Sequence, residues 1–281
     1  MYRIVKKESL NPTVMRMSIE APLVAKKAEP GQFIILRVSE DGERIPLTVA
    51  GYDREKGTVE IIFQIVGATT KKLSEKAAGD YLPDFVGPLG RKTDLEGRKN
   101  VVIVGGGVGC AIALPIARKL HELGCRVTSV IGFRTKDLVI LEDEFRACSD
   151  ETIIMTDDGS YGNKGVVTAP LKEKLDADGT IDEIITIGPL IMMKFVVETA
   201  RPYQVKTTVS MNPIMIDGTG MCGGCRLTVG GQTKFACVDG PDFDGYLVDF
   251  DEAMMRGTTY REFEKHAYEE ACNLFAKEVR S

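Results

Sequence analysis

Three cysteines lie close together in the segment DGTGMCGGCRLTVGGQTKFACVDG, residues 217–240. Cys222 and Cys225 are separated by two residues, and Cys237 follows after eleven more. This spacing matches the last three positions of the plant-type C-x4-C-x2-C…C pattern, whose thiolates hold a [2Fe–2S] cluster. The missing first position falls on Asp217, and a carboxylate can coordinate iron. The spacing therefore predicts a [2Fe–2S] cluster held by Asp217 and the three cysteines.

Other interpretations of this segment stay open. Zinc is one, although structural zinc sites usually carry two paired knuckles and this chain has a single C-x2-C. Free thiols are another. Asp217 could also cap the turn through its side chain, leaving water or another oxygen on the iron. The glycines of the segment suit a loop that points backbone N–H groups at the cluster sulfurs; they are Gly218, Gly220, Gly223 and Gly224.

A glycine-rich turn follows the apolar run NVVIV. Turns without side chains let backbone N–H groups and a helix N-terminus face an anion, so this turn is a candidate phosphate cradle. It is not the G-x-G-x-x-G fingerprint, and the next strand closes on GFRTKD, with Arg134 and Lys136, instead of on an acidic residue. The alternative is a tight strand-to-helix turn without a ligand. The turn consists of Gly105, Gly106, Gly107, Val108 and Gly109.

The segments ERIPLTVAG and FQIVGATTKKL form a second candidate binding site. An arginine, hydroxyl groups and a helix start can bind a pyrophosphate, and an extended Pro-Leu-Thr segment can lie along a flat ring. An ordinary strand edge, with a helix N-cap and a solvated arginine, is the alternative. The residues concerned are Arg44, Pro46, Leu47, Thr48, Gln64, Ile65, Val66, Gly67, Thr69 and Thr70.

The elements that must position these motifs change in type along the chain. Residues 1–96 contain short alternating strands separated by turn signals, which predicts a small antiparallel barrel. Residues 97–210 alternate apolar runs with helical segments, which predicts a parallel α/β sheet with ligands at the carboxyl ends of its strands. The cysteines lie in 211–250, and 251–281 shows the apolar stripe of a helix.

The composition limits the class of protein. The chain has 281 residues, 43% of them hydrophobic, and a net charge of −5 from 36 basic and 41 acidic residues. This charge argues against a nucleic-acid partner. No signal-peptide core or membrane-length apolar run is present, so we expect a soluble cytoplasmic protein with no membrane contact. With only two histidines, the protein either binds a ligand or carries out its chemistry with a cofactor.

These motifs, in this order, resemble the family of flavin and [2Fe–2S] subunits related to ferredoxin–NADP reductase. The segment NPIMIDGTGMCGGCR is the most specific part of the resemblance. Within that family, Asp217 and the long tail are similar to the small subunits of NADH-dependent ferredoxin:NADP⁺ oxidoreductases. The electron-transfer subunits of type B dihydroorotate dehydrogenases are more distant, because they use four cysteines.

The resemblance implies where the cofactors bind. Residues 44–48 and 64–70 would hold FAD, and the glycine turn would hold NAD(H). Two departures stand out: Arg44 lies one residue further from Thr48 than in the family's Arg-x-Tyr-Ser/Thr motif, and Ile187 replaces the cysteine of a Cys-Gly-Pro motif. The remaining residues implied at the nicotinamide nucleotide are Arg134, Asp157, Asp158, Gly159, Ser160, Gly188 and Pro189.

The resemblance also implies a function. NADH would pass hydride to FAD, and the cluster would pass electrons singly to a larger partner carrying a second FAD and [4Fe–4S] clusters. That complex would couple NADH, NADPH and, indirectly, ferredoxin by electron bifurcation. Two alternatives are an electron-transfer subunit of a type B dihydroorotate dehydrogenase and a non-enzymatic zinc-binding regulatory module.

Two finer points have competing interpretations. NAD(H) is favoured over NADP(H), although Arg134 and Lys136 could pair with a 2′-phosphate. The tail from Asp251 onward would either dock onto the partner or pack on its own domain.

Overall fold

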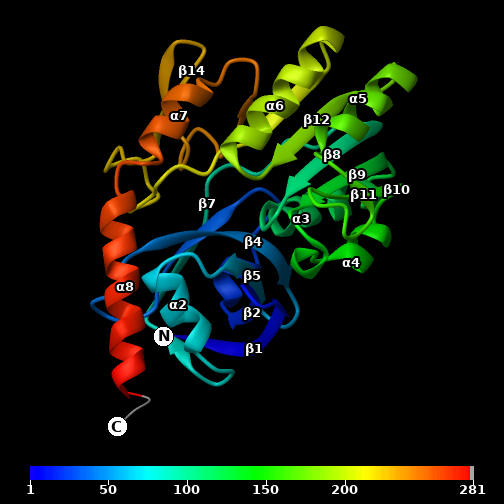
Figure 1. Cartoon of the computed structure of the whole chain (residues 1–281). Helices are drawn as coiled ribbons and strands as arrows, with labels where there is room; N and C mark the ends of the chain where they lie inside the picture. The colour runs from blue at the N-terminus through cyan, green and yellow to red at the C-terminus, as the bar shows by residue number, and fades with distance from the viewer. Residues whose placement is uncertain (279–281) are drawn as a thin grey trace.

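A computed structural model describes residues 1–278, with side chains as far as Glu269. Figure 1 shows a barrel at the N-terminal end and an α/β sheet with a C-terminal segment above it. The barrel is a nearly closed antiparallel sheet in the order β6-β1-β2-β5-β4-β3-β7. Its elements are β1 (Tyr2–Asn11), β2 (Val14–Glu20), α1 (Pro22–Ala25), β3 (Phe33–Arg37), β4 (Ile45–Asp53), β5 (Thr58–Gln64), α2 (Ala68–Glu75), β6 (Tyr81–Leu82) and β7 (Asp84–Leu89).

The strand alternation explains the barrel. Val59, Ile61 and Phe63 of β5 turn their side chains inward and are buried, as are Met17 and Ile19 on the neighbouring β2. Residues two apart lie on one face of a strand, so each strand contributes one apolar side to the barrel interior. The predicted antiparallel barrel is confirmed.

The second sheet is parallel apart from one edge strand. Its order is β11-β10-β9-β8-β12-β13-β16, and β16 runs antiparallel to β13. Its strands are β8 (Asn100–Gly106), β9 (Arg126–Phe133), β10 (Glu151–Thr156), β11 (Asn163–Lys164), β12 (Glu183–Ile187), β13 (Lys206–Ser210) and β16 (Asp242–Asp244). Its helices are α3 (Gly109–Glu122), α4 (Glu142–Arg146), α5 (Thr168–Ala177) and α6 (Leu190–Ala200), with 3₁₀ turns at Lys136–Leu138 and Arg201–Tyr203.

Helices cover both faces of this sheet. On β8, Val101 and Ile103 belong to the core that α3 and α4 close, whereas Val102 and Val104 belong to the core that α5 and α6 close. A strand buried on both faces is apolar throughout, which is why NVVIV shows no polar alternation. The predicted parallel α/β domain is confirmed.

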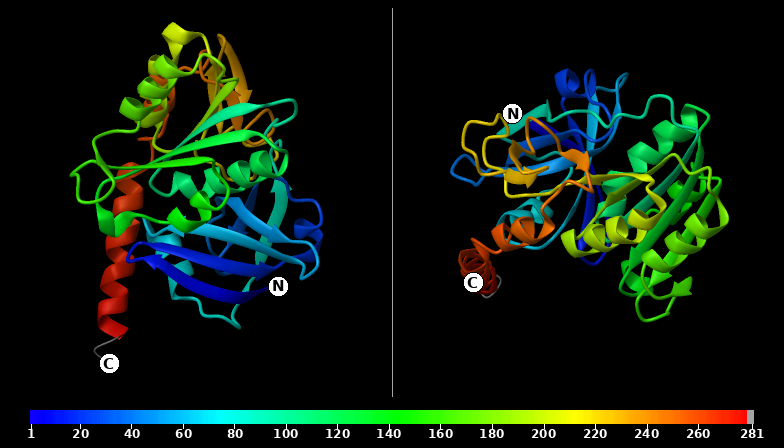
Figure 2. Two further views of the ribbon diagram at one scale, coloured as in Figure 1. Left: turned by 90° about the vertical axis from the view of Figure 1, so that its right-hand side faces the viewer. Right: turned by 90° about the horizontal axis from the view of Figure 1, so that it is seen from above.

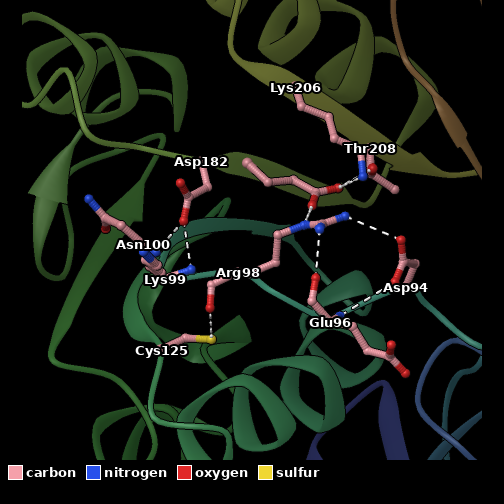
Figure 3. Close-up of polar contacts among 10 residues, drawn as sticks. Asp94, Glu96, Arg98, Lys99, Asn100, Cys125, Asp182, Lys206 and Thr208 are labelled. Carbon is pink, nitrogen blue, oxygen red and sulfur yellow. Dashed lines mark hydrogen bonds and ion pairs between the residues drawn. The ribbon is translucent and has the colours of Figure 1, made fainter.

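Ion pairs around the buried Glu183 join the second sheet to the chain that links it to the barrel (Figure 3). Glu183 of β12, which is only 1% exposed, accepts hydrogen bonds from Arg98 and from the Thr208 hydroxyl at 2.5 Å. Lys206 Nζ lies 3.0 Å from the same carboxylate, and Asp94 pairs with Arg98 at 3.3 Å. Since a buried carboxylate is stable only with such partners, the segment after the barrel is held firmly against the sheet.

The C-terminal part begins as a hairpin and ends as helices. Its elements are β14 (Arg226–Val229), β15 (Gln232–Phe235), α7 (Phe250–Arg256) and α8 (Arg261–Glu278). Between the hairpin and α7 the chain returns to the second sheet as β16, so the cysteine segment is joined to that sheet at both ends.

Helix α8 runs down the side of the barrel next to α2 (Figures 1 and 2). The helical tail that the apolar stripe predicts is therefore present. Residues 261–267 are nevertheless all exposed, and Phe263 is 75% exposed. Docking of this tail onto a partner stays a prediction. None of the helices in the described part of the chain has the length and apolar character needed to cross a membrane.

Candidate functional site

A cleft of about 1130 Å³ lies between the barrel and the second sheet. The barrel contributes β4, the end of β5 and the start of α2 to its wall. The second sheet contributes the loops that follow β8, β9, β10 and β12, as expected at the carboxyl ends of parallel strands. The predicted residues that line it are Pro46, Leu47, Thr48, Gln64, Val66, Thr70, Gly106, Gly107, Val108, Gly109, Arg134, Asp157, Gly188 and Pro189.

The remaining predicted residues lie outside the cleft wall. Thr69 donates a hydrogen bond to Glu43 at 2.8 Å. Ser160 donates to Asp158 at 2.7 Å and accepts from the Lys136 N–H at 2.8 Å, closing a local turn. Their contact with a cofactor stays a prediction. The full set outside the wall is Arg44, Ile65, Gly67, Thr69, Gly105, Asp158, Gly159 and Ser160.

The turn that leads into α3 needs glycine, because the neighbouring backbone packs closely against it. A Cβ on Gly109 would lie 2.5 Å from the Ile187 carbonyl oxygen and 2.8 Å from the Gly188 Cα. Gly107 has a φ of +55°, in the left-handed region that favours glycine. The turn is therefore tight, and it also exposes Gly106 to Gly109 to the cleft at the N-terminus of a fourteen-residue helix. Its geometry suits an anionic ligand.

On the barrel side of the cleft, the loop before α2 and the first turn of α2 form part of the wall. The Thr70 hydroxyl accepts hydrogen bonds from the Val66 and Gly67 N–H groups at 3.0 Å and donates to the Gly67 carbonyl at 3.0 Å. This cap holds the loop after β5 in an ordered conformation at the cleft. Arg44 is exposed and lies immediately before β4.

Some of the charged side chains that follow β9 and β10 line the cleft, and others do not. Arg134 and Asp157 both line the cleft. Lys136 does not, because its ammonium group lies over the Tyr161 ring, 5.6 Å from the centroid. A 2′-phosphate at this corner would meet one cation and one carboxylate, which weakens the case for NADP(H) that the two cations make in the sequence.

Several residues that line the cleft were not predicted from the sequence. They belong to segments that return to the cleft from the C-terminal part of the chain or from the barrel rim. For the loop after β13, the sequence did offer a signal. This loop follows a parallel strand, so it should lie at the same edge of the sheet as the other cleft loops. The main residues missed are Asn11, Thr13, Phe33, Ser210, Met211, Asn212, Pro213, Met215 and Pro241.

The four predicted cluster ligands form two pairs. Cys225 and Cys237 are buried, with their Sγ atoms 3.2 Å apart. Asp217 accepts hydrogen bonds from the Thr219 N–H at 2.8 Å and the Cys222 N–H at 2.9 Å. These two contacts fold the loop back so that the Asp217 carboxylate lies beside Cys222.

This arrangement fits a cluster with two irons, each held by two protein ligands. A single zinc ion would instead need four ligands that converge on one point. The loop glycines Gly218, Gly220 and Gly223 all have positive φ, so the wrap around this site depends on glycine.

The protonation behaviour differs between the predicted ligands. Hydrogen bonds from Thr219 and then Cys222 hold the pKa of Asp217 below its usual value, so its carboxylate is ionised. Burial and the neighbouring Cys225 thiol raise the pKa of Cys237 to about 12. A buried thiol pair of this kind becomes a pair of thiolates only when a cation such as iron compensates the charge.

The comparisons with known proteins agree with this architecture. Residues 212–249 match the iron–sulfur cluster binding domain of dihydroorotate dehydrogenase B. The electron-transfer subunit homologue of dihydroorotate dehydrogenase B (NAD⁺) from Thermotoga maritima is 51% identical over 95% of this chain and 94% of its own length. The electron-transfer subunit from Streptococcus pneumoniae strain R6 is 34% identical over 86% of this chain and 94% of its own length.

A solved structure is similar over almost the whole chain. It comes from a study of flavin-based electron bifurcation in an NADH-dependent reduced ferredoxin-NADP oxidoreductase. Its chain is 49% identical and superposes with a TM-score of 0.90, covering 96% of this chain and 97% of its own.

Barrel, parallel sheet and iron–sulfur segment together define an electron-transfer protein of the ferredoxin-reductase type. More narrowly, the chain belongs to the family of dihydroorotate dehydrogenase B electron-transfer subunits and their homologues. The family resemblance seen in the sequence is confirmed, and a role as a flavin and iron–sulfur electron-transfer subunit is favoured over a zinc-binding regulatory module.

Proposed function

We propose that this chain is the NADH-oxidising subunit of an NADH-dependent ferredoxin:NADP⁺ oxidoreductase. It would carry FAD on the barrel side of the cleft, NAD(H) on the side of the second sheet, and a [2Fe–2S] cluster in the loop after β13. When bound, the flavin accepts hydride from NADH and the cluster carries the electrons onward one at a time.

One observation carries this proposal: the cleft and the cluster loop share a single stretch of chain. Residues 210–213 and Met215 line the cleft, and Asp217, the first proposed ligand of the cluster, follows two residues after Met215. A group bound at this wall would therefore be adjacent to the cluster loop. This continuity supports the proposal, because an electron-transfer subunit needs its two-electron site close to its one-electron site.

The cleft residues have distinct roles in this account. The extended segment Pro46 to Thr48 would lie along the flavin ring, and the N–H groups at the start of α2 would face its pyrophosphate. The turn Gly106 to Gly109 would hold the nucleotide phosphates at the N-terminus of α3. The apolar floor excludes water, which favours hydride transfer over side reactions.

The cluster side suggests where the electrons leave. Cys222 is exposed, its neighbour Met221 is 89% exposed, and Ile216 and Val238 of the same segment are also exposed, so this loop offers apolar surface that a partner could cover. The partner would be a larger subunit with a second FAD and [4Fe–4S] clusters, through which NADPH and ferredoxin react. The chain is 49% identical to the ferredoxin-NADP oxidoreductase chain and 51% identical to the Thermotoga maritima homologue of the dihydroorotate dehydrogenase B subunit, so identity does not separate the two partners. The choice of partner rests on Asp217 at the first predicted ligand position, where the dihydroorotate-type subunits use a cysteine.

The nucleotide preference tests the proposal in the isolated subunit. Anaerobic protein should contain one FAD and two irons per chain, and NADH should bleach the flavin absorbance. Because Asp157 lies beside Arg134 in the cleft, we expect half-saturation at a tenfold lower concentration for NADH than for NADPH, about 1.4 kcal/mol. A clear preference for NADPH would contradict the NAD(H) assignment, and a protein without flavin would contradict the function.

The identity of the partner needs a separate measurement. Purification of the chain from its native cells should recover a larger subunit that contains FAD and [4Fe–4S] clusters. Recovery of a partner that contains FMN and oxidises dihydroorotate would contradict the ferredoxin:NADP⁺ assignment while leaving NADH oxidation by this chain intact.

A further inference from the structure

Asp242 lies directly behind the floor of the cleft. It begins β16, and it is paired across the sheet with Ser210, the last residue of β13. Ser210 and Pro241, the residue before Asp242, both line the cleft. None of the proposed cofactor contacts or cluster ligands involves the Asp242 side chain, so its position needs another explanation.

Three segments that are distant in sequence meet at this carboxyl group. The Thr93 hydroxyl, on the link between the two sheets, donates to Asp242 Oδ2 at 2.6 Å. The Thr93 N–H donates to the Pro30 carbonyl of the barrel at 2.9 Å. The link is thus joined to the second sheet by the side chains of Thr93 and Asp242, and to the barrel by a backbone hydrogen bond of Thr93.

The packing around this contact is close on the side of the barrel. Gly31 has a φ of +87°, and a Cβ there would lie 2.2 Å from the Thr93 hydroxyl oxygen. The Arg91 N–H donates to the Gly240 carbonyl at 2.7 Å, and the Met211 N–H donates to the Pro241 carbonyl at 2.9 Å. Displacing Asp242 would therefore displace residues that form the cleft floor.

The carboxyl group is in an unusual environment. Its Oδ1 is buried without a hydrogen-bond partner, one of four such side-chain atoms in the part of the chain that the structure describes. Burial raises the pKa of Asp242, and the negative charge of Glu183 adds to this, whereas the hydroxyls of Thr93 and Ser210 oppose it. Burial thus disfavours the charged form of this carboxyl group, and asparagine has nearly the shape of an aspartic acid side chain.

We propose that Asp242 is a positioning residue that holds the cleft-lining end of β13 against the barrel through Thr93 and so sets the distance between flavin and nicotinamide. This inference rests on the proposed function, since the distance matters only if hydride crosses the cleft. Hydride transfer is sensitive to such distances, and a displacement of about 1 Å can cost up to a hundredfold in rate.

The test compares Asp242→Ala and Asp242→Asn with Asp244→Ala, which removes an exposed carboxylate from the same strand. In the full chain with its cofactors, we expect Asp242→Ala to slow flavin reduction at saturating NADH about tenfold. The dissociation constant of NADH should stay within twofold, because the nucleotide contacts are intact. Asp242→Asn should recover most of the rate, and Asp244→Ala should match the wild type.

A second readout is independent of catalysis. In hydrogen exchange without nucleotide, Asp242→Ala should speed exchange in both 90–97 and 206–213, while Asp244→Ala changes neither. If Asp242→Ala does not fold, Thr93→Ala removes the same contact from the other side and should give the same pattern. A wild-type rate in a folded Asp242→Ala protein, or unchanged exchange in both segments, would overturn the inference. A wild-type flavin that NADH does not reduce would instead overturn the proposed function.

Discussion

Asp217→Ala is expected to leave the cluster labile, with most of the iron lost during anaerobic desalting. Removing the carboxylate would delete the proposed fourth ligand of the cluster, and it also removes the two hydrogen bonds that close the loop, from Thr219 and Cys222. Asp217→Cys should keep the cluster and lower its reduction potential by on the order of 100 mV, because thiolate donates more charge to iron than carboxylate does. Iron analysis and a potentiometric titration followed by electron paramagnetic resonance measure both.

A matched control separates ligation from loop structure. Asp239 also accepts a backbone hydrogen bond within the cysteine segment, from the Phe235 N–H at 2.8 Å, but it is not a predicted ligand. Asp239→Ala should therefore retain its iron and its potential. If Asp217→Ala keeps an unaltered spectrum and potential, Asp217 only caps the turn and an oxygen from elsewhere completes the iron site.

Gly109→Ala is expected to weaken NADH binding by about 10- to 100-fold, because the displaced turn no longer matches the phosphates. The added methyl group would lie 2.5 Å from the Ile187 carbonyl oxygen, which is backbone and cannot rotate away. The same overpacking should lower the free energy of unfolding by about 1–3 kcal/mol. Fluorescence titration and urea unfolding report the two quantities.

Gly179→Ala is the control for this substitution, since a Cβ there meets nothing within 4 Å and the φ is ordinary. It should leave both NADH binding and stability within experimental error of the wild type. A folded Gly109→Ala protein that binds NADH as tightly as the wild type would show that the turn serves packing alone.

Local patterns were enough to predict the architecture. Apolar and polar residues alternate on β5 because one face of that strand is buried. The apolar residues of β8 are continuous because both of its faces are buried, and either pattern can be seen in the sequence. The glycine turn could be predicted from its run of glycines. The sequence does not show that Gly107 needs glycine for its positive φ, whereas Gly109 needs it because the Ile187 and Gly188 backbone lies close. The cysteine spacing proposes a ligand set that stays a prediction, and the structure adds that Asp217 lies beside Cys222 and Cys225 beside Cys237.

Long-range contacts could not be predicted from the sequence. Ser210 and Asp242 are 32 residues apart, and they meet because β16 returns to the sheet edge after the cluster loop; no local pattern records that return. The position of Lys136 over Tyr161 likewise depends on a turn between neighbouring strands. The sequence therefore suggested two cations for a 2′-phosphate, and the structure leaves only Arg134 of the two in the cleft wall.

The most direct test of the account is whether electrons from NADH reach the cluster within this chain alone. The purified subunit, with FAD and two irons, should be mixed anaerobically with NADH and frozen at successive times. Loss of flavin absorbance should be followed by the electron paramagnetic resonance signal of a reduced [2Fe–2S] cluster, and chains that lack the Cys225 thiol should show only the first event. A cluster signal that never forms, or that forms at the same rate without flavin, would contradict the proposed path from nucleotide to flavin to cluster.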